Sequence, residues 1–167
     1  FKVDRVKGET FEEELVHSER VQEKLTKAIQ IKTISHENDN ETDWGEFQKF
    51  HDFLRESFPL VHENLTVEDV SKASLLFYWK GTDEKLDPIA FPAHQDVVPV
   101  ARGTEDDWEH PAFEGFNDGE FIWGRGALDM KNHLICLMES VETLLEEGYQ
   151  PKRSVYLCFG HNEEIVA

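Results

Sequence analysis

The chain has 167 residues, of which 17 are lysine or arginine and 35 are aspartate or glutamate, so its formal net charge is −18. Such a charge repels phosphate backbones and anionic lipids, which argues against a role in binding nucleic acid or membrane surfaces. No apolar run approaches the roughly 20 residues that a bilayer-spanning helix needs. The length suits one domain of roughly 100–200 residues. The acidic excess indicates either a hydrophilic shell or carboxylates gathered to hold cations.

The two cysteines, Cys136 and Cys158, are too few for a disulfide scaffold. Both lie in apolar segments, so we predict two buried free thiols. This usage leans toward a reducing compartment and hence the cytoplasm. The chain begins at Phe1, however, and a removed leader would change that assignment, so the compartment stays open.

Two helices are predicted in the first third of the chain. Thr10 and Glu13 have the spacing of a capping box, and apolar residues then recur at helical spacing. This pattern predicts an amphipathic helix over residues 10–31. A second apolar stripe, from Trp44 to Phe58, predicts a helix that ends at Pro59.

Short segments rich in β-branched and aromatic residues follow, and they predict strands over residues 64–70, 74–79 and 89–94. Pro92 cannot donate a hydrogen bond to a neighbouring strand, so we expect a bulge or an edge position there. A loop rich in acidic residues, glycine and proline is predicted over 102–119, before a brief strand over 121–123.

The last third of the chain predicts a helix and then a strand. Apolar residues trace a helical stripe over 130–145, with Gly148 as the cap at its C-terminus. A fully apolar strand is predicted over 154–159. The order strand, helix, strand is typical of parallel neighbouring strands joined by a crossover. We therefore predict an α/β fold, with a mixed, partly parallel sheet flanked by helices.

An imidazole and a carboxylate follow the predicted strand 89–94. His94 and Asp96 are two residues apart, which places both side chains on one face of an extended backbone. A metal-bound imidazole commonly needs a carboxylate to fix its tautomer, and Asp96 has the right position. The alternative is a surface histidine beside a turn aspartate.

Two further acidic groups stand at ends of predicted elements. Asp129 ends a glycine-bracketed loop at the start of the long helix, where it serves either as a helix cap or as a bridge between two cations. Glu163 and Glu164 follow the apolar strand 154–159. Adjacent glutamates are usually a solvated pair, but the carboxyl end of a central strand is where open α/β sheets bind ligands.

Together these clusters resemble the metal-site motifs of the M20 family of di-zinc metallopeptidases and amidohydrolases, especially its carboxypeptidase S and N-acyl-amino-acid hydrolase branch. The resemblance covers most of the chain and rests on four motifs in order: HQDVVP at 94–99, Trp108 with PAF at 111–113, GRGALDMK at 124–131, and GHNEE at 160–164.

The resemblance implies a role for each of five residues in a zinc-peptidase-like catalytic domain. It implies that His94 binds one zinc ion, that Asp129 bridges two, and that Glu164 binds the second. It also implies that Glu163 is the general base and that Asp96 orients His94. Paired zinc ions would polarise the scissile carbonyl and acidify the attacking water. The family also tends to have a cis peptide after the bridging aspartate, so one is expected between Asp129 and Met130.

The sequence departs from the family pattern after Glu164, where a glycine is usual and Ile165 stands instead. The resemblance also expects further metal ligands and a lid or dimerisation domain that this sequence does not contain. A catalytic zinc takes about three protein ligands, and the three ligands named here cannot supply two ions. We therefore expect residues 1–167 to be the N-terminal portion of an M20-type catalytic domain, incomplete and weakly active or inactive alone.

The hypothesis for the parent enzyme is a metal-dependent hydrolase that cleaves a peptide or N-acyl amide bond next to a free carboxylate. Its partners would be a small peptide or N-acyl-amino-acid substrate and, through a domain that this sequence does not contain, a second copy of itself. One alternative is a non-catalytic acidic module that holds calcium, although calcium makes little use of imidazole. A single-metal hydrolase is the other. Arg125 is interpreted as an anchor of the glycine-rich loop rather than a substrate contact.

Overall fold

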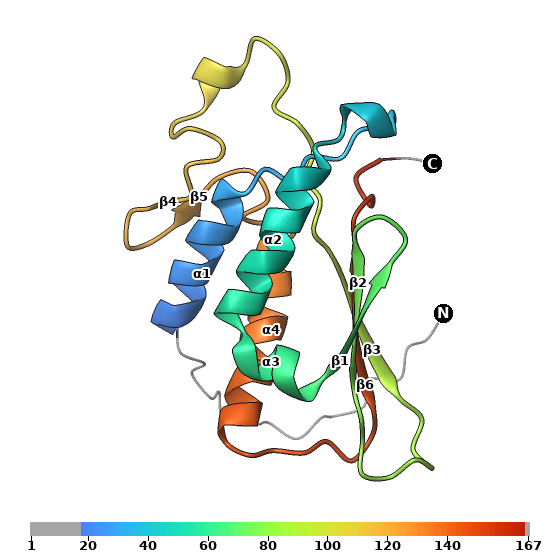
Figure 1. Ribbon diagram of the computed structural model, residues 1–167. Coiled ribbons are helices and arrows are strands. Elements are labelled where there is room, and N and C mark those ends of the chain that lie inside the picture. Colours follow the sequence, from blue (N-terminus) through green and yellow to red (C-terminus); the bar gives the residue numbers. More distant parts are fainter. Residues whose placement is uncertain (1–17, 166–167) are drawn as a thin grey trace, which may run out of the picture.

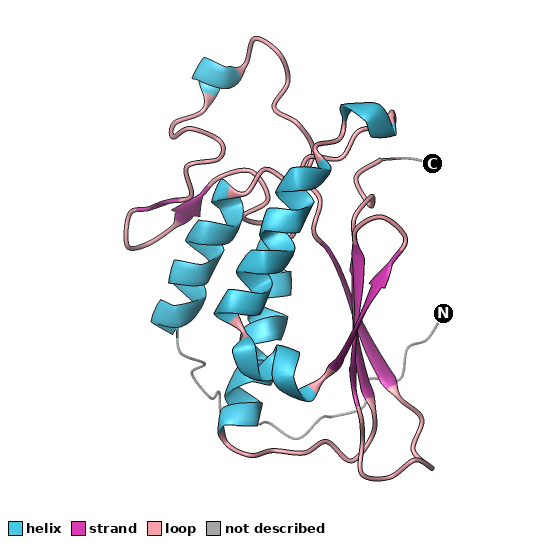
Figure 2. Cartoon of the chain, viewed as in Figure 1, coloured by secondary structure: helices cyan, strands magenta, loops and turns pink. Residues whose placement is uncertain are grey.

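The computed structural model describes residues 18–165. The predicted capping box at Thr10 and the first part of the predicted helix 10–31 lie outside these residues. Helices cover one face of a twisted sheet (Figure 1). A long loop and a two-stranded hairpin lie beyond the helices (Figure 2).

The main sheet has four strands in the order β1-β2-β6-β3. Their bounds are Thr66–Val70 for β1, Ser74–Trp79 for β2, Ile89–His94 for β3 and Val155–Gly160 for β6. The two pairs β1–β2 and β2–β6 are antiparallel, whereas β3 and β6 are parallel. The predicted mixed, partly parallel sheet is therefore confirmed. Pro92 lies in β3, at one edge of the sheet as described, which agrees with the prediction for that proline.

Four α-helices are described: α1 (Ser18–Gln30), α2 (Trp44–Ser57), α3 (Pro59–Asn64) and α4 (Lys131–Glu146). The sequence predicted α1, α2 and α4 but not the short helix α3. Pro59 stands at the first position of α3, where its missing N–H costs nothing. Glu142 of α4 then accepts hydrogen bonds from the N–H groups of Leu60 and Val61, so a residue far away in the sequence caps this helix.

Two short strands form a hairpin, in which each strand is stabilised by pairing with the other. The predicted brief strand is β5 (Ile122–Trp123), and it pairs with β4 (Phe116–Asn117). The sequence had placed β4 within a loop, because two residues carry too little periodic signal to be recognised alone. Two short 3-10 helices, Asp39–Glu41 and Glu105–Asp107, complete the elements.

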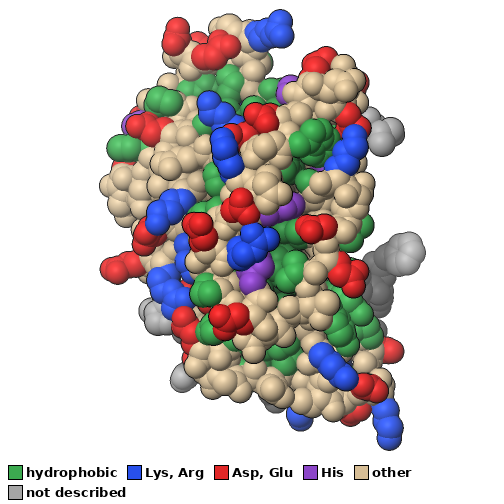
Figure 3. Space-filling model, in the orientation of Figure 1, with side chains coloured by type: hydrophobic (Ala, Val, Ile, Leu, Met, Phe, Trp, Pro, Cys, Tyr) green, Lys and Arg blue, Asp and Glu red, His purple; other side chains and the backbone are tan. Residues whose placement is uncertain are grey.

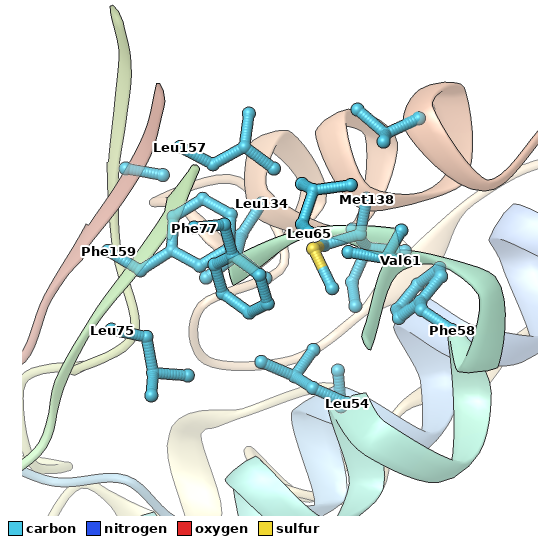
Figure 4. Packing of buried hydrophobic residues seen from close by; sticks show 14 of the residues in the cluster. Leu54, Phe58, Val61, Leu65, Leu75, Phe77, Leu134, Met138, Leu157 and Phe159 are labelled. Atoms are coloured by element: carbon cyan, nitrogen blue, oxygen red, sulfur yellow. The ribbon is translucent and has the colours of Figure 1, made fainter. Parts of the chain in front are cut away.

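The hydrophobic core fills the space between the sheet and the helices (Figure 4). Alternate residues of β2 and β6, such as Phe77 and Phe159, point into it, and their rings pack with centroids 5.5 Å apart. Leu54 of α2, Met138 of α4 and Phe58, which lies between α2 and α3, meet them from the other side. This arrangement explains why the two strands read as apolar in the sequence.

The prediction of two buried thiols is wrong. Cys136 is exposed and Cys158 is only half-buried. Cys136 lies on α4 next to the buried Ile135, but 100° further around the helix, so it faces away from the core. Cys158 alternates along β6 with the buried Leu157 and Phe159, which turns it toward the sheet face opposite the helices.

Acidic side chains are spread over the face seen in Figure 3, with lysine and arginine side chains between them. Much of the acidic excess therefore forms a hydrophilic shell. Within residues 18–165, no helix combines the length and apolar character needed to cross a membrane.

A buried lysine joins α4 to α1. The Lys131 side chain has no solvent exposure, and its Nζ donates hydrogen bonds to the carbonyl oxygens of Ala28 (2.8 Å) and Ile31 (2.6 Å). Its Nζ also lies 5.0 Å from the ring centroid of Phe50. Burial lowers the pKa of Lys131 to about 7, against the opposing effect of the Glu46 charge.

This lowered pKa predicts that the stability of the fold changes with pH in the neutral to alkaline range. The unfolded chain holds the Lys131 proton up to its ordinary pKa of 10.5, whereas the folded chain releases it above about 7. The free energy of unfolding should therefore rise between these values, by an amount on the order of 5 kcal/mol in total. Urea unfolding of the wild type and of Lys131→Met at pH 7 and pH 9.5 tests this.

The difference between the two proteins isolates the lysine, because every other titrating group is common to both. We expect the wild type to gain stability relative to Lys131→Met as the pH rises. A difference that stays constant between the two pH values would show that the ammonium form is held as well in the fold as in water.

Candidate metal centre

The parallel pairing of β3 with β6 brings two of the predicted clusters together at the carboxyl ends of these strands (Figure 1). His94 is the last residue of β3 and lies opposite Gly160, the last residue of β6. Glu163 and Glu164 follow in a turn. Asp129 comes from elsewhere, in the loop just before α4.

The predicted side chains meet around the imidazole of His94. Its Nε2 atom lies 3.1 Å from Oδ1 of Asp129 and 3.6 Å from Oε2 of Glu163. One ligand atom each from His94, Glu163 and Glu164 lie within 4.8 Å of one another. The structure thus brings all four side chains to one place. His94, Glu163 and Glu164 form a tight group, and Asp129 lies beside the imidazole of His94.

Asp96 lies beneath this cluster and is fully buried. Its backbone carbonyl oxygen is 2.9 Å from Nδ1 of His94, whereas its carboxylate is 3.4 Å from that atom. The carboxylate instead accepts hydrogen bonds from the backbone N–H groups of Glu163 (3.2 Å) and Glu164 (3.1 Å). Asp96 therefore holds the imidazole mainly through its carbonyl and holds the glutamate turn through its side chain.

Sequence reasoning missed Ser35, which also supports Asp96. The buried Ser35 Oγ donates a hydrogen bond of 2.7 Å to Asp96 Oδ2. It reaches this position because a bridge between Ile34 and Val97 joins the chain after α1 to the chain after β3. Ser35 and Asp96 are 61 residues apart in the sequence, and no pattern along the chain indicates their contact.

The environment of His94 suits a metal ligand. When Nδ1 donates its proton to the Asp96 carbonyl, the lone pair of Nε2 points toward the carboxylates, as a metal-binding imidazole requires. Burial lowers the pKa of His94, but hydrogen bonds to the Asp96 carbonyl and the Asp129 carboxylate, together with the charges of Asp96 and Glu163, outweigh it and raise that pKa above its usual value. The same carboxylates that favour a proton on Nε2 would favour a metal cation in its place.

Within the part of the chain that the structure describes, the His94 imidazole is the basic group that pairs with the carboxylates of Asp129 and Glu163. Among residues 18–165, no lysine or arginine forms an ion pair with Asp129, Glu163 or Glu164. Burial, followed by the charge of Asp129, raises the pKa of Glu164 above its usual value. An imidazole nitrogen and several crowded carboxylate oxygens are a donor set that fits zinc, and a divalent cation would relieve their mutual repulsion.

A glycine-rich loop brings Asp129 to the site. Gly126 has a positive φ of 81°, and an added Cβ would lie 2.7 Å from Val97 Cγ1, so only glycine fits there. The Arg125 N–H donates to the Ala112 carbonyl at 2.6 Å, and the guanidinium lies 5.2 Å from the Trp108 ring centroid. These contacts agree with the interpretation of Arg125 as a loop anchor. The expected cis peptide between Asp129 and Met130 is present.

Fold and site together define an α/β domain with an imidazole and carboxylate cluster at the carboxyl ends of its parallel strands. Residues 90–167 match the sequence model of a protein family described as "Peptidase family M20/M25/M40". The chain belongs to this family of peptidases.

The similar proteins include longer peptidases and amide hydrolases. The chain is 46% identical over 145 residues to "Probable carboxypeptidase S-like 2" of Dictyostelium discoideum. The aligned region covers 86% of this chain and 28% of that protein. It is 41% identical over 165 residues to the mouse (Mus musculus) "N-fatty-acyl-amino acid synthase/hydrolase PM20D1", with 96% and 31% covered. The chain thus spans less than a third of the length of these relatives.

A solved structure shares the fold. It is the M20 family metallo-carboxypeptidase Sso-CP2 from Sulfolobus solfataricus, with a TM-score of 0.68 and 18% sequence identity. The match covers 86% of this chain and 31% of that one. The predicted fold class therefore agrees with a solved member of the same family.

Proposed function

We propose that this chain is part of a metal-dependent hydrolase that cleaves a peptide or N-acyl amide bond next to a free carboxylate. The observation that carries the proposal is the meeting of His94, Glu163 and Glu164 within 4.8 Å at the carboxyl ends of β3 and β6. The names of the relatives, a carboxypeptidase and an N-fatty-acyl-amino acid hydrolase, support the substrate class.

Zinc is the metal that we propose, with His94, Asp129 and Glu164 as ligands. Bound zinc supplies a Lewis acid that polarises the scissile carbonyl and makes water a stronger acid. A two-zinc centre takes about three protein ligands for each ion, so three residues fill only part of it. We propose that this chain contributes one part of a larger catalytic domain and that the remaining ligands come from outside residues 1–167.

Glu163 is the proposed general base. Its side chain is 64% exposed and its carboxylate lies 3.6 Å from His94 Nε2, so it reaches both solvent and the reacting centre. There it would accept a proton from the attacking water and later donate that proton to the leaving amine. Asp96 would keep this carboxylate in position, because it fixes the backbone N–H of Glu163.

Zinc binding and hydrolysis by the purified chain test this function. After removal of metal with a chelator, we expect the chain to bind zinc in calorimetric titration and to hydrolyse an N-acyl amino acid weakly or not at all. Elemental analysis then gives the number of metals per chain. A folded chain that binds no zinc would refute the metal assignment, and full turnover would refute the proposal that further ligands are needed.

Calcium is the matched control in the same titration. Calcium prefers six to eight oxygen ligands and makes little use of imidazole, so it should bind more weakly than zinc. Tighter binding of calcium than of zinc would favour a non-catalytic acidic module over the hydrolase.

A further inference from the structure

Gln95 stands between His94 and Asp96 in the sequence, and the proposed mechanism gives it no role. The residue is fully buried. Its backbone N–H donates to the Gly160 carbonyl at 2.8 Å, and its backbone carbonyl accepts from Thr33 Oγ1 at 2.6 Å. A buried amide side chain is stable only where its polar atoms find partners, so its contacts show what it holds together.

The amide nitrogen of Gln95 connects three segments of the chain. It donates to the carbonyl oxygens of Ala73 (2.8 Å) and Phe159 (3.0 Å), with a longer contact of 3.3 Å to Gly160. Ala73 belongs to the turn between β1 and β2, and the other two residues end β6. One side chain thus ties the end of β3 to the end of β6 and to the neighbouring turn.

His51 of α2 completes this arrangement. Its Nε2 lies 2.9 Å from Gln95 Oε1 and 3.1 Å from the Ala73 carbonyl oxygen. Both neighbours are acceptors, so Nε2 carries the proton. The reversed amide would place its oxygen against backbone carbonyl oxygens, which excludes that orientation. The His51 side chain is buried as well, at 8% exposure, so this hydrogen bond is shielded from water.

We propose that Gln95, held by His51, is a positioning residue for the candidate metal centre. Glu163 and Glu164 follow Gly160 by three and four residues, and their distance to His94 depends on how the ends of β3 and β6 are joined. Gln95 sets that junction without touching substrate or metal. The inference rests on the proposed function for its consequence in catalysis, whereas the positioning itself is testable in the metal-free chain.

The variant Gln95→Met keeps the size of the side chain and removes both its donor and its acceptor. Zinc affinity should fall about tenfold, the lower end of the effect of residues that support ligands. Without metal, the amides of Glu163 and Glu164 should exchange with deuterium about tenfold faster, because the turn opens locally. Calorimetry with zinc alone and hydrogen exchange read by NMR measure these two effects on the 167-residue chain.

Glu142→Gln is the matched control. Glu142 is a buried polar residue that caps α3, and it lies roughly 16 Å along α4 from Lys131 at the start of that helix. This variant should lose stability but keep the zinc affinity and the amide exchange of the glutamate turn. Equal changes in both variants would overturn the proposal, because general destabilisation would then explain them.

His51→Leu provides a second test if Gln95→Met does not fold. This variant keeps the hydrogen bonds of the Gln95 amide nitrogen and removes the donor to its amide oxygen. Zinc affinity should therefore fall, and amide exchange of Glu163 and Glu164 should speed up, by less than in Gln95→Met. Unchanged exchange and unchanged zinc binding would overturn the proposal. A wild-type chain that binds no zinc would refute the proposed metal centre alone, since amide exchange would still decide the role of Gln95.

Discussion

Zinc affinity should fall at least about a hundredfold in His94→Ala, more than the roughly 10–100-fold loss expected for residues that only support a ligand. His94 is the nitrogen donor of the candidate site, its side chain is only 6% exposed, and its Nδ1 is already fixed by Asp96. Among residues 18–165, no other imidazole belongs to the candidate metal-binding group of His94, Glu163 and Glu164. Competition with a chromophoric chelator measures the affinity.

The adjacent glutamates offer a matched pair of variants. Glu164→Gln should weaken zinc binding strongly, because a proposed ligand is lost. Glu163→Gln should leave zinc binding nearly intact and affect only proton transfer. Glu163 also lies in the tight group with His94. A larger loss of zinc affinity in Glu163→Gln than in Glu164→Gln would therefore show that Glu163 is the ligand and Glu164 the general base.

The free energy of unfolding should decrease by about 4.5 kcal/mol or more in Asp96→Ala, because a hydrogen bond to a buried charged group is worth about 1.5–3 kcal/mol and the variant loses three of them. The variant leaves three donors unpaired, namely Ser35 Oγ and the N–H groups of Glu163 and Glu164. Urea unfolding followed by circular dichroism measures the change.

Two controls separate this effect from a general one. Ser35→Ala removes a single donor to the same carboxylate and should cost about 1.5–3 kcal/mol, less than the loss of all three. Asp52→Ala removes an exposed carboxylate paired with Arg55 and should change stability by less than about 0.5 kcal/mol. Equal stability of Asp96→Ala and the wild type would mean that water replaces the carboxylate without loss.

Periodicity predicted the long elements of the fold well. The strands Ser74–Trp79 and Ile89–His94 begin and end where the sequence places them, because β-branched and aromatic runs bounded by Gly, Asp and Pro are a local signal. The helix α4 differs from its prediction by one residue at each end. By contrast, α3 and β4 were missed, because a distant carboxylate and a partner strand stabilise them.

The candidate site shows the same division. Sequence patterns were enough to predict which imidazole and carboxylates stand at the ends of elements, because residue type and position along the chain are local properties. The support from Ser35, His51 and Gln95 became visible only in the folded chain, as did the fact that the Asp96 carboxylate bonds to the glutamate turn more than to the imidazole. Such contacts join segments up to 68 residues apart, and they arise from the β3–β6 pairing, the bridge between Ile34 and Val97 and the packing of α2, so no pattern along the chain contains them.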